Sequence, residues 1–520
     1  MPPLDLQLVS PLGSRPCRRS TCDSAVARSA THPVPAEVPK YAKPGSKAFA
    51  GRSYLPKYAK PGSKAVAGHP YLPEYANLGL MPRTAYRCEK MVADTLFSPS
   101  QARKPMSKRT RTEKDLAGPC PLMRTCGGCA WLGVPYKKQL VRKQRAMEEL
   151  FVPLLERFGW QLEIDPIRGM GGTSESTGKL ASPRAFRYKA TTPFAPRPNG
   201  RIACGFYAPG THRIVAAEDC AVEAPGARRI LNEVARVAES FGIRAYDEDA
   251  QRGLLRHAIV RLGWRTDEGM LTVVTSNRDL PHAEEFAQAL LEIDPRITCV
   301  AQNVNPRPGN AILGPETRVL AGAPSMQDEL LGCTFSISPT AFYQTNPQQT
   351  EVLYQLAIDG MALEAEDALF DAYCGSGTIG LCAARASANA GRAVRLQGVE
   401  KNEAGVADAR ANAELNGFTP HEATFVADDA TAFLRQAARD GERYDVITLD
   451  PPRAGSTPAF LEAAMAISPR RIVYISCNPA TQARDLEVLG AGGYRLLRLS
   501  PVDMFPHTEH VETVAVLERA

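Results

Sequence analysis

Three cysteines are crowded into ten residues of the sequence. Cys120, Cys126 and Cys129 lie in CPLMRTCGGC, where two adjacent glycines allow the backbone to fold tightly around one centre. Cys220, in the turn-like segment HRIVAAEDCAVEAPG, is the best candidate for a fourth ligand, whereas Cys204 lies in the apolar, strand-like IACGFY. Four thiolates suit either tetrahedral zinc or an iron–sulfur cluster. Three clustered cysteines with one remote cysteine favour the cluster over zinc, and both over incidental core thiols.

A further cysteine has the surroundings of a nucleophile. Cys477 follows the apolar run IVYIS and precedes the helix-like segment PATQARDL. The positive N-terminal end of a helix can favour the thiolate form of a cysteine at this position. The competing interpretation is a buried core thiol, but the polar neighbours Ser476 and Asn478 argue against it.

A glycine-rich loop and two acidic residues predict a cofactor site. The segment DAYCGSGTIG, from Asp371 to Gly380, lies between a predicted strand and a predicted helix. Glu400 ends the next strand, 25 residues beyond Gly375, close to where an acid would bind ribose hydroxyls. Dinucleotide and S-adenosylmethionine sites both combine a glycine-rich loop with an acidic residue at the end of the next strand. This loop lacks a strict GxGxxG and therefore suits S-adenosylmethionine better. Asp450, in YDVITLDPPRAG, ends another apolar run, where two prolines turn its carboxylate toward the same cleft.

The elements that must position these residues alternate between strand and helix. From about residue 331 the pattern predicts strands at 335–339, 368–373 and 394–400 and helices at 348–363 and 378–390. This alternation is typical of an α/β domain with an open parallel sheet. The strand-like segments HAIVRLGW and MLTVVTSN precede it.

Charge divides the chain into two unequal parts. The 520 residues carry a net charge of +6, yet residues 1–115 carry +12 and the remainder −6. The basic segment contains a 17-residue repeat rich in Pro, Gly, Ala and Lys, which predicts a disordered arm. The arm could add nonspecific phosphate attraction, or Met106 could be the true start of the protein. No apolar run is long enough to cross a membrane, and the odd count of 13 cysteines without a secretory signal predicts a reducing, cytoplasmic location.

Together these motifs resemble the RNA uracil-5-methyltransferase family, whose members methylate ribosomal or transfer RNA. The resemblance covers roughly residues 116–520 and rests on motifs in family order: CPLMRTCGGC, AFYQTNPQQTEVLY, DAYCGSGTIG, GVEKNEAGVADARANAELNG, LDPPRAG, SCNPATQARDL and DMFPHTEHVE. One departure is that no run of strands precedes Cys120 to form the small RNA-binding β-barrel with which many ribosomal members begin.

The resemblance implies roles for individual residues. Cys477 matches the nucleophile that adds to carbon 6 of uracil, and Glu512, in HVE, matches the base that removes the hydrogen from carbon 5. The matches to cofactor contacts are Gln344, Tyr373, Glu400, Asp450 and, more weakly because Asp428 could replace it, Asp429. The matches to ligands of a 4Fe-4S cluster are Cys120, Cys126, Cys129 and Cys220.

We therefore expect three regions and a methyltransferase. These are a disordered arm (1–115), an iron–sulfur and central α+β RNA-recognition region (116–335), and a Rossmann-like S-adenosylmethionine methyltransferase domain (336–520). The expected activity is methylation of carbon 5 of a uridine in structured RNA, most naturally 23S ribosomal RNA, by a monomer. The alternatives are a transfer-RNA methylase and a noncatalytic iron–sulfur RNA-binding protein. Arg142, Lys143 and Arg145 either contact phosphate or form a solvated helix face.

Overall fold

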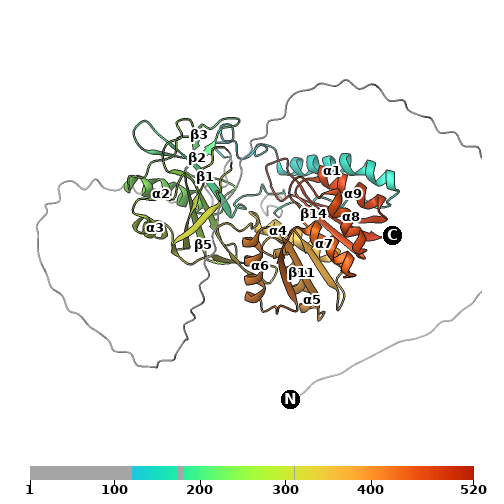
Figure 1. The fold of residues 1–520 in the computed structure, drawn as a ribbon. Coiled ribbons are helices and arrows are strands. Elements are labelled where there is room, and N and C mark those ends of the chain that lie inside the picture. Colours follow the sequence, from blue (N-terminus) through green and yellow to red (C-terminus); the bar gives the residue numbers. More distant parts are fainter. Residues whose placement is uncertain (1–119, 172–179, 310) are drawn as a thin grey trace, which may run out of the picture. The chain divides into compact units, whose positions relative to one another are not determined.

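The computed structural model describes residues 120–171, 180–309 and 311–520 (Figure 1). The predicted arm at 1–115, with its repeat and Met106, lies outside the described residues. Within the described part of the chain, no helix is both long and apolar enough to cross a membrane.

The central part of the chain forms a mainly antiparallel sheet. Its seven strands lie in the order β3-β2-β1-β4-β5-β6-β7, and only β5 and β6 pair in parallel. The strands are β1 (Lys189–Pro196), β2 (Ile202–Tyr207), β3 (Ile214–Ala216), β4 (Leu255–Leu262), β5 (Gly269–Thr275), β6 (Ile297–Val304) and β7 (Glu316–Gly322). Helices α2 (Ala227–Ser240) and α3 (Ala283–Leu291) pack their apolar residues against one face of this sheet. The expected α+β character of this region is confirmed.

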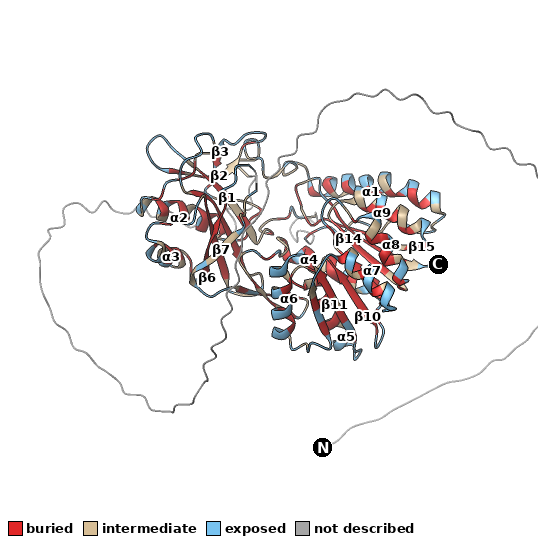
Figure 2. Ribbon diagram, viewed as in Figure 1, coloured by how far each residue is buried: buried red, intermediate tan, exposed pale blue. Residues whose placement is uncertain are grey.

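The C-terminal part contains a second seven-stranded sheet, in the order β12-β11-β10-β13-β14-β16-β15. Strands β12, β11, β10, β13 and β14 pair in parallel, and β16 is antiparallel to its neighbours β14 and β15, so β15 runs in the same direction as the first five. The strands are β10 (Ala368–Ala372), β11 (Arg395–Glu400), β12 (Ala423–Ala427), β13 (Val446–Leu449), β14 (Arg471–Ser476), β15 (Tyr494–Val502) and β16 (Glu512–Arg519). The central strands are buried along their whole length, as Figure 2 shows in red, which is why they are continuously apolar in the sequence.

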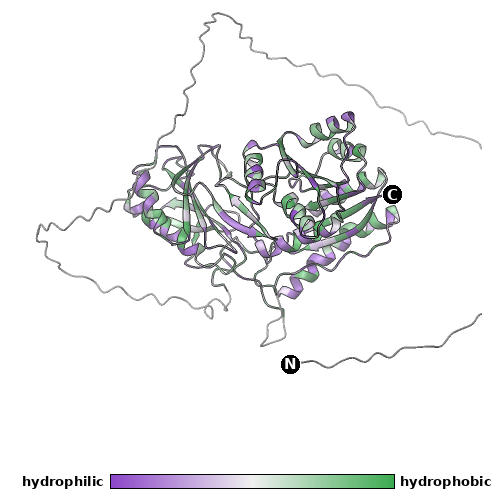
Figure 3. Cartoon of the chain, turned by 90° about the horizontal axis from the view of Figure 1, so that it is seen from below, coloured by the Kyte–Doolittle hydropathy of each residue, from purple (hydrophilic) through white to green (hydrophobic). Residues whose placement is uncertain are grey.

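Helices cover both faces of the second sheet. One face packs against α4 (Pro347–Met361), α5 (Thr378–Asn389) and α6 (Glu403–Leu415). The other face packs against α1 (Tyr136–Phe158), α7 (Ala430–Asp440), α8 (Pro458–Ile467) and α9 (Pro479–Ala491). Their ribbons carry both purple and green in Figure 3, because each helix turns apolar residues toward the sheet and polar residues outward. The predicted Rossmann-like α/β fold is confirmed.

Two elements outside the expected alternation also pack on the second sheet. Helix α1 lies far upstream in the sequence, yet Met147, Phe151 and Leu154 share a core with β10 and α9. The hairpin of β8 (Met326–Leu330) and β9 (Cys333–Ile337) packs against α5 and α6. Through α1, the first described residues of the chain therefore pack against its last third.

Candidate active site

The ends of three strands place the predicted catalytic residues at one edge of the second sheet. Asp450 directly follows β13, and Cys477 directly follows β14. Strand β16 runs opposite to β14, so its first residue, Glu512, lies at the same edge. The register pairs Ser476 with Thr513, so Cys477 and Glu512 come at the next position along the same two strands.

The thiol of Cys477 is half-buried among charged groups. Burial raises its pKa above the usual 9.0, and the carboxyls of Glu512 and Asp450 raise it further. The guanidinium of Arg453 acts in the opposite direction. We expect the N-terminus of α9 to favour the thiolate, but burial and then the neighbouring carboxyls outweigh that effect and raise the pKa of this thiol. A cation entering the site would favour the thiolate.

The two carboxyls beside Cys477 also resist ionisation. Glu512 is 4% exposed, and burial together with the charge of Asp450 raises its pKa to about 8, against the effect of Arg453. Asp450 keeps some exposure at the edge of the sheet, but surrounding protein atoms still raise its pKa to about 7. Perturbed carboxyls of this kind are common at catalytic sites. Arg453 belongs to the LDPPRAG motif, yet sequence reasoning gave it no role.

The glycine-rich loop is shaped by two acidic residues. Asp371 is fully buried in β10 and its carboxylate accepts a hydrogen bond from the backbone N–H of Gly380 at 3.0 Å. Its second oxygen is buried without a partner among the described residues, and burial raises its pKa to about 7. Glu400 accepts a hydrogen bond from the Gly375 N–H at 3.3 Å. Gly377 has φ +79° and lies so close to the Phe425 ring that a Cβ would approach it to 3.1 Å.

Asp371 is assigned no role of its own by the sequence motifs. It opens the quoted DAYCGSGTIG motif, and an aspartate inside an otherwise apolar strand was the available signal.

Tyr373, at the start of this loop, interacts electrostatically with Asp429. Tyr373 adopts a left-handed backbone conformation with φ +60°, and its hydroxyl lies 3.4 Å from the Ser456 hydroxyl. The charge of Asp429 helps to raise the pKa of Tyr373, after the larger effect of burial. Asp429 is also the N-cap of α7, where one oxygen accepts hydrogen bonds from the Thr431 and Ala432 N–H groups. The neighbouring Asp428 accepts from the Asp429 N–H at 2.7 Å.

Gln344 lies in the loop that leads into α4. The Ser376 hydroxyl bonds the carbonyl of Phe342 at 3.5 Å, which ties this loop to the glycine-rich loop. Phe342 itself is 67% exposed, which is unusual for a large aromatic ring. Gln344 lines a cavity that also includes residues of the central sheet. Gln344 therefore lies at a cavity beside the central sheet, in the loop that Ser376 ties to the glycine-rich loop.

The four predicted metal-binding cysteines line one cavity. Its other walls are largely apolar, with one cation, Arg187, and two carboxylates, Asp219 and Glu223. Burial raises the pKa of Cys126 and Cys129, and raises that of Cys220 to about 12. Among the described residues, no three His, Cys, Asp or Glu side chains are gathered closely enough to hold a single metal ion. The cysteines thus share one cavity without converging on one ion position.

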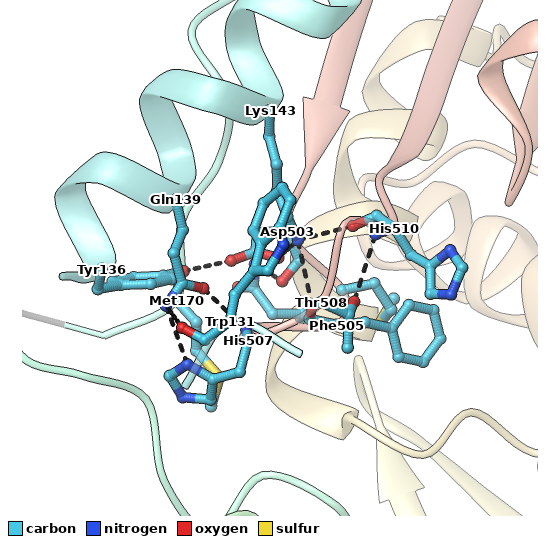
Figure 4. Close-up of polar contacts among 12 residues, drawn as sticks. Trp131, Tyr136, Gln139, Lys143, Met170, Asp503, Phe505, His507, Thr508 and His510 are labelled. Carbon is cyan, nitrogen blue, oxygen red and sulfur yellow. Dashed lines mark hydrogen bonds and ion pairs between the residues drawn. The ribbon is translucent and has the colours of Figure 1, made fainter. Parts of the chain in front are cut away.

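The segment that leads into Glu512 is held by α1 (Figure 4). Lys143 donates to the Asp503 carboxylate at 2.5 Å and to the carbonyls of Phe505 and His510 at 3.1 and 2.7 Å. Tyr136, two turns earlier on α1, donates to the other Asp503 oxygen at 2.7 Å. These bonds fix residues 503–510 immediately before the predicted base.

The same segment is also tied to the cysteine-bearing loop. Gln139 accepts from the His507 N–H at 2.9 Å and donates to the Trp131 carbonyl at 3.0 Å. The Trp131 N–H in turn donates to the His507 carbonyl at 2.9 Å. Trp131 is only two residues beyond Cys129.

Lys143 is thereby excluded from RNA contact. It is 1% exposed and ion-paired with the fully buried Asp503, so for Lys143 both the phosphate contact and the favoured solvated helix face are wrong. Arg142 and Arg145 are exposed, and Arg145 bonds Glu149 at 2.7 Å. The helical spacing places Lys143 on the buried face and the two arginines on the solvated face.

Comparison with known proteins decides the family. A family model described as tRNA (uracil-5-)-methyltransferase matches residues 331–520. An uncharacterized RNA methyltransferase of Halalkalibacterium halodurans is 39% identical over 400 residues, covering 77% of this chain and 83% of that protein. The chain belongs to the RNA uracil-5-methyltransferase family. An uncharacterized RNA methyltransferase of Bacillus cereus is 37% identical over 402 residues, covering 77% of this chain and 82% of that protein.

A solved structure shows the same fold. The Pyrococcus abyssi tRNA (uracil-54, C5)-methyltransferase, in complex with S-adenosyl-L-homocysteine, superposes with a TM-score of 0.59 at 24% identity, covering 76% of this chain and 86% of that one. Family membership makes this chain an enzyme, an RNA (uracil-5-)-methyltransferase. The alternative of a noncatalytic RNA-binding protein is not retained.

Proposed function

We propose that the enzyme transfers a methyl group from S-adenosylmethionine to carbon 5 of a uridine in structured RNA, with Cys477 as nucleophile and Glu512 as base. The observation that carries this proposal is the pairing of β14 with β16, which brings these two residues to one sheet edge beside Asp450. The Pyrococcus abyssi relative was solved with S-adenosyl-L-homocysteine, which is the product of methyl transfer from this cofactor.

The chemistry requires a nucleophile because carbon 5 of uracil does not attack a methyl group unaided. The Cys477 thiolate adds to carbon 6, and the electrons of the carbon 5–carbon 6 double bond move toward the carbonyl at carbon 4. Carbon 5 then takes the methyl group that the cofactor supplies. Glu512 removes the proton from carbon 5, the double bond re-forms, and the sulfur–carbon bond breaks to return the thiolate.

The buried carboxyls of the site fit a cationic cofactor. The pKa values of Asp371, Asp450 and Glu512 are all raised by burial, so in the free enzyme these groups resist ionisation. The sulfonium group of S-adenosylmethionine carries a positive charge, which would favour the ionised carboxylates and the Cys477 thiolate. We propose Gln344, Tyr373, Glu400, Asp429 and Asp450 as its contacts.

We further propose that Cys120, Cys126, Cys129 and Cys220 hold a 4Fe-4S cluster. The fit rests on four thiols around one largely apolar cavity. In a zinc site all four sulfurs lie about 2.3 Å from one ion, and so about 3.8 Å from each other. In a four-iron cluster each cysteine binds a different iron, so sulfurs spread around a cavity suit the cluster better. Arg187, Asp219 and Glu223 also line this cavity and would face the bound group, while Glu223 is ion-paired with Arg228.

Two RNA classes are candidates for the substrate. The ordered set of motifs that carries the family resemblance supports 23S ribosomal RNA. The family model's description and the Pyrococcus abyssi relative favour transfer RNA as the second candidate. In either case the target uridine must be unstacked, because a thiol and a cofactor cannot both reach a stacked base.

The test is a map of 5-methyluridine in RNA from cells that lack the gene and from complemented cells. A position in 23S ribosomal RNA that loses its methyl group and regains it only with active enzyme supports the first candidate. Loss confined to transfer RNA supports the second. An unchanged map in both RNA classes would contradict the proposed function.

A further inference from the structure

Two cations lie directly opposite each other on neighbouring strands of the central sheet. The register of β1 and β4 pairs Lys189 with Arg261. Like charges at directly opposite positions of a sheet destabilise it. Arg261 is only 5% exposed and Lys189 is half-buried, so solvent screens this repulsion poorly.

Among the described residues, no carboxylate compensates the charge of this pair. Within the described part of the chain neither side chain forms an ion pair, and Lys189 has no hydrogen-bond partner. Arg261 donates to the carbonyl of Ala341. Burial and then the neighbouring Arg261 lower the pKa of Lys189 to about 8, and burial lowers that of Arg261 to about 10.

The two cations line a cavity that reaches the active-site loop. Its wall includes Tyr343 and Gln344 from the loop before α4, and the buried Tyr343 hydroxyl has no partner among the described residues. Asp328 is the one carboxylate among the residues lining this cavity. One of its oxygens already accepts the Trp264 and Arg265 N–H groups, both at 3.0 Å.

The cations occupy the sheet face that the helices leave free. Their neighbours in register, Ala190 and Val260, belong to the core beneath α2 and α3. Side chains alternate between the two faces of a strand, so Lys189 and Arg261 point the other way. A burial cost that no described residue compensates indicates a ligand that supplies the missing negative charge.

We propose that Lys189 and Arg261 bind a phosphate of the RNA backbone next to the target uridine, with the Tyr343 hydroxyl as an additional donor. The position beside Gln344 is what places this phosphate near the reacting base. The inference rests on the proposed function, and it assigns the RNA strand a path across the central sheet into the active site. The carboxylate in the methionine part of the cofactor is also an anion that two cations could bind. The experiment therefore distinguishes an RNA phosphate from this carboxylate.

The test uses the full-length Lys189→Met variant and a fluorescent ten-nucleotide oligouridylate, without cofactor, so that no turnover is needed. We expect several-fold weaker binding of the oligouridylate. The negative slope of log affinity against log salt should become shallower by about 0.7, the value for one lost phosphate contact with a single strand. Lys189→Arg should restore affinity because it restores the charge. Calorimetry should give unchanged S-adenosylmethionine affinity, and the unfolding midpoint should stay constant or rise because a repulsion is removed.

The control is Arg392→Met, which removes an exposed cation just before β11, at the opposite edge of the second sheet. It should leave the oligouridylate affinity unchanged. Unchanged affinity and salt slope in Lys189→Met would overturn the proposal, as would a loss of affinity that Lys189→Arg does not restore. Weaker cofactor binding with normal RNA binding would assign the site to the cofactor carboxylate instead. Inactive wild-type enzyme would contradict the proposed function without changing any of these binding results.

Discussion

At the residue scale, the chemistry of the site depends on carboxyls that hold their protons unusually tightly. Burial beside Asp450 raises the pKa of Glu512 from 4.5 to about 8. Between these values the unfolded chain has lost the Glu512 proton while the folded enzyme keeps it. The folded state binds more protons there, so this residue makes stability fall as the pH rises from 4.5 toward 8.

Glu512→Gln should therefore stabilise the enzyme increasingly over this range. Glutamine is nearly isosteric and carries no ionisable proton, so it removes the pH-dependent cost. We expect the gain in unfolding free energy to be small at pH 5 and to reach a few kcal/mol, to order of magnitude, at pH 8. Urea unfolding at both pH values measures it. The exposed Glu462→Gln on α8 is the control, and an equal effect at both pH values would contradict the raised pKa.

At the element scale, the catalytic edge depends on a helix that is remote in sequence. Helix α1 carries Lys143, whose three bonds fix the segment before Glu512. The alternation of strands and helices was predictable from residue 331 onward because each strand is a short apolar run and each helix is amphipathic. The docking of α1 was not predictable, because a buried lysine and a solvated lysine look alike in a charged helix. The Lys189–Arg261 pair was not predictable either, because the register between two strands is a long-range property of the fold.

Lys143→Met should destabilise the enzyme by about 3–5 kcal/mol, because it leaves the Asp503 carboxylate buried without its cation. It should also lower kcat more than it raises KM for RNA, since the segment before Glu512 loses its anchor. Urea unfolding and steady-state methyl transfer measure the two effects. Arg142→Met on the exposed face of α1 should change neither quantity. Wild-type stability and kcat in Lys143→Met would show that the anchor is dispensable.

At the scale of the whole molecule, three parts far apart in the sequence meet around the proposed active site. The cysteine-bearing loop contacts the segment before Glu512 through Trp131 and His507. The loop before α4 connects the glycine-rich loop to the central sheet. The net charge of +6 gave no indication of this arrangement, since it sums a basic N-terminal segment and an acidic remainder. The motifs identified the parts, and only the fold shows how they meet.

The proposed cluster is tested at this scale by Cys220→Ser. Wild-type protein purified without oxygen should be brown and contain about four iron atoms per chain. The variant should lose most of both while its far-UV circular dichroism is retained. Cys204→Ser is the matched control. Cys204 is a buried thiol of β2 that bonds the Thr192 hydroxyl and does not line the cavity. A colourless wild-type protein with one zinc ion per chain would contradict the cluster.

The central claim is that Cys477 and Glu512 act in sequence on one uracil. The most direct measurement is denaturing gel electrophoresis of Glu512→Gln after incubation with target RNA and S-adenosylmethionine carrying a labelled methyl group. We predict a labelled protein–RNA adduct that survives denaturation, because the thiol adds and the methyl group transfers but the proton on carbon 5 is not removed. The double variant Cys477→Ala with Glu512→Gln should form none. Rapid turnover of Glu512→Gln without any adduct would contradict the mechanism.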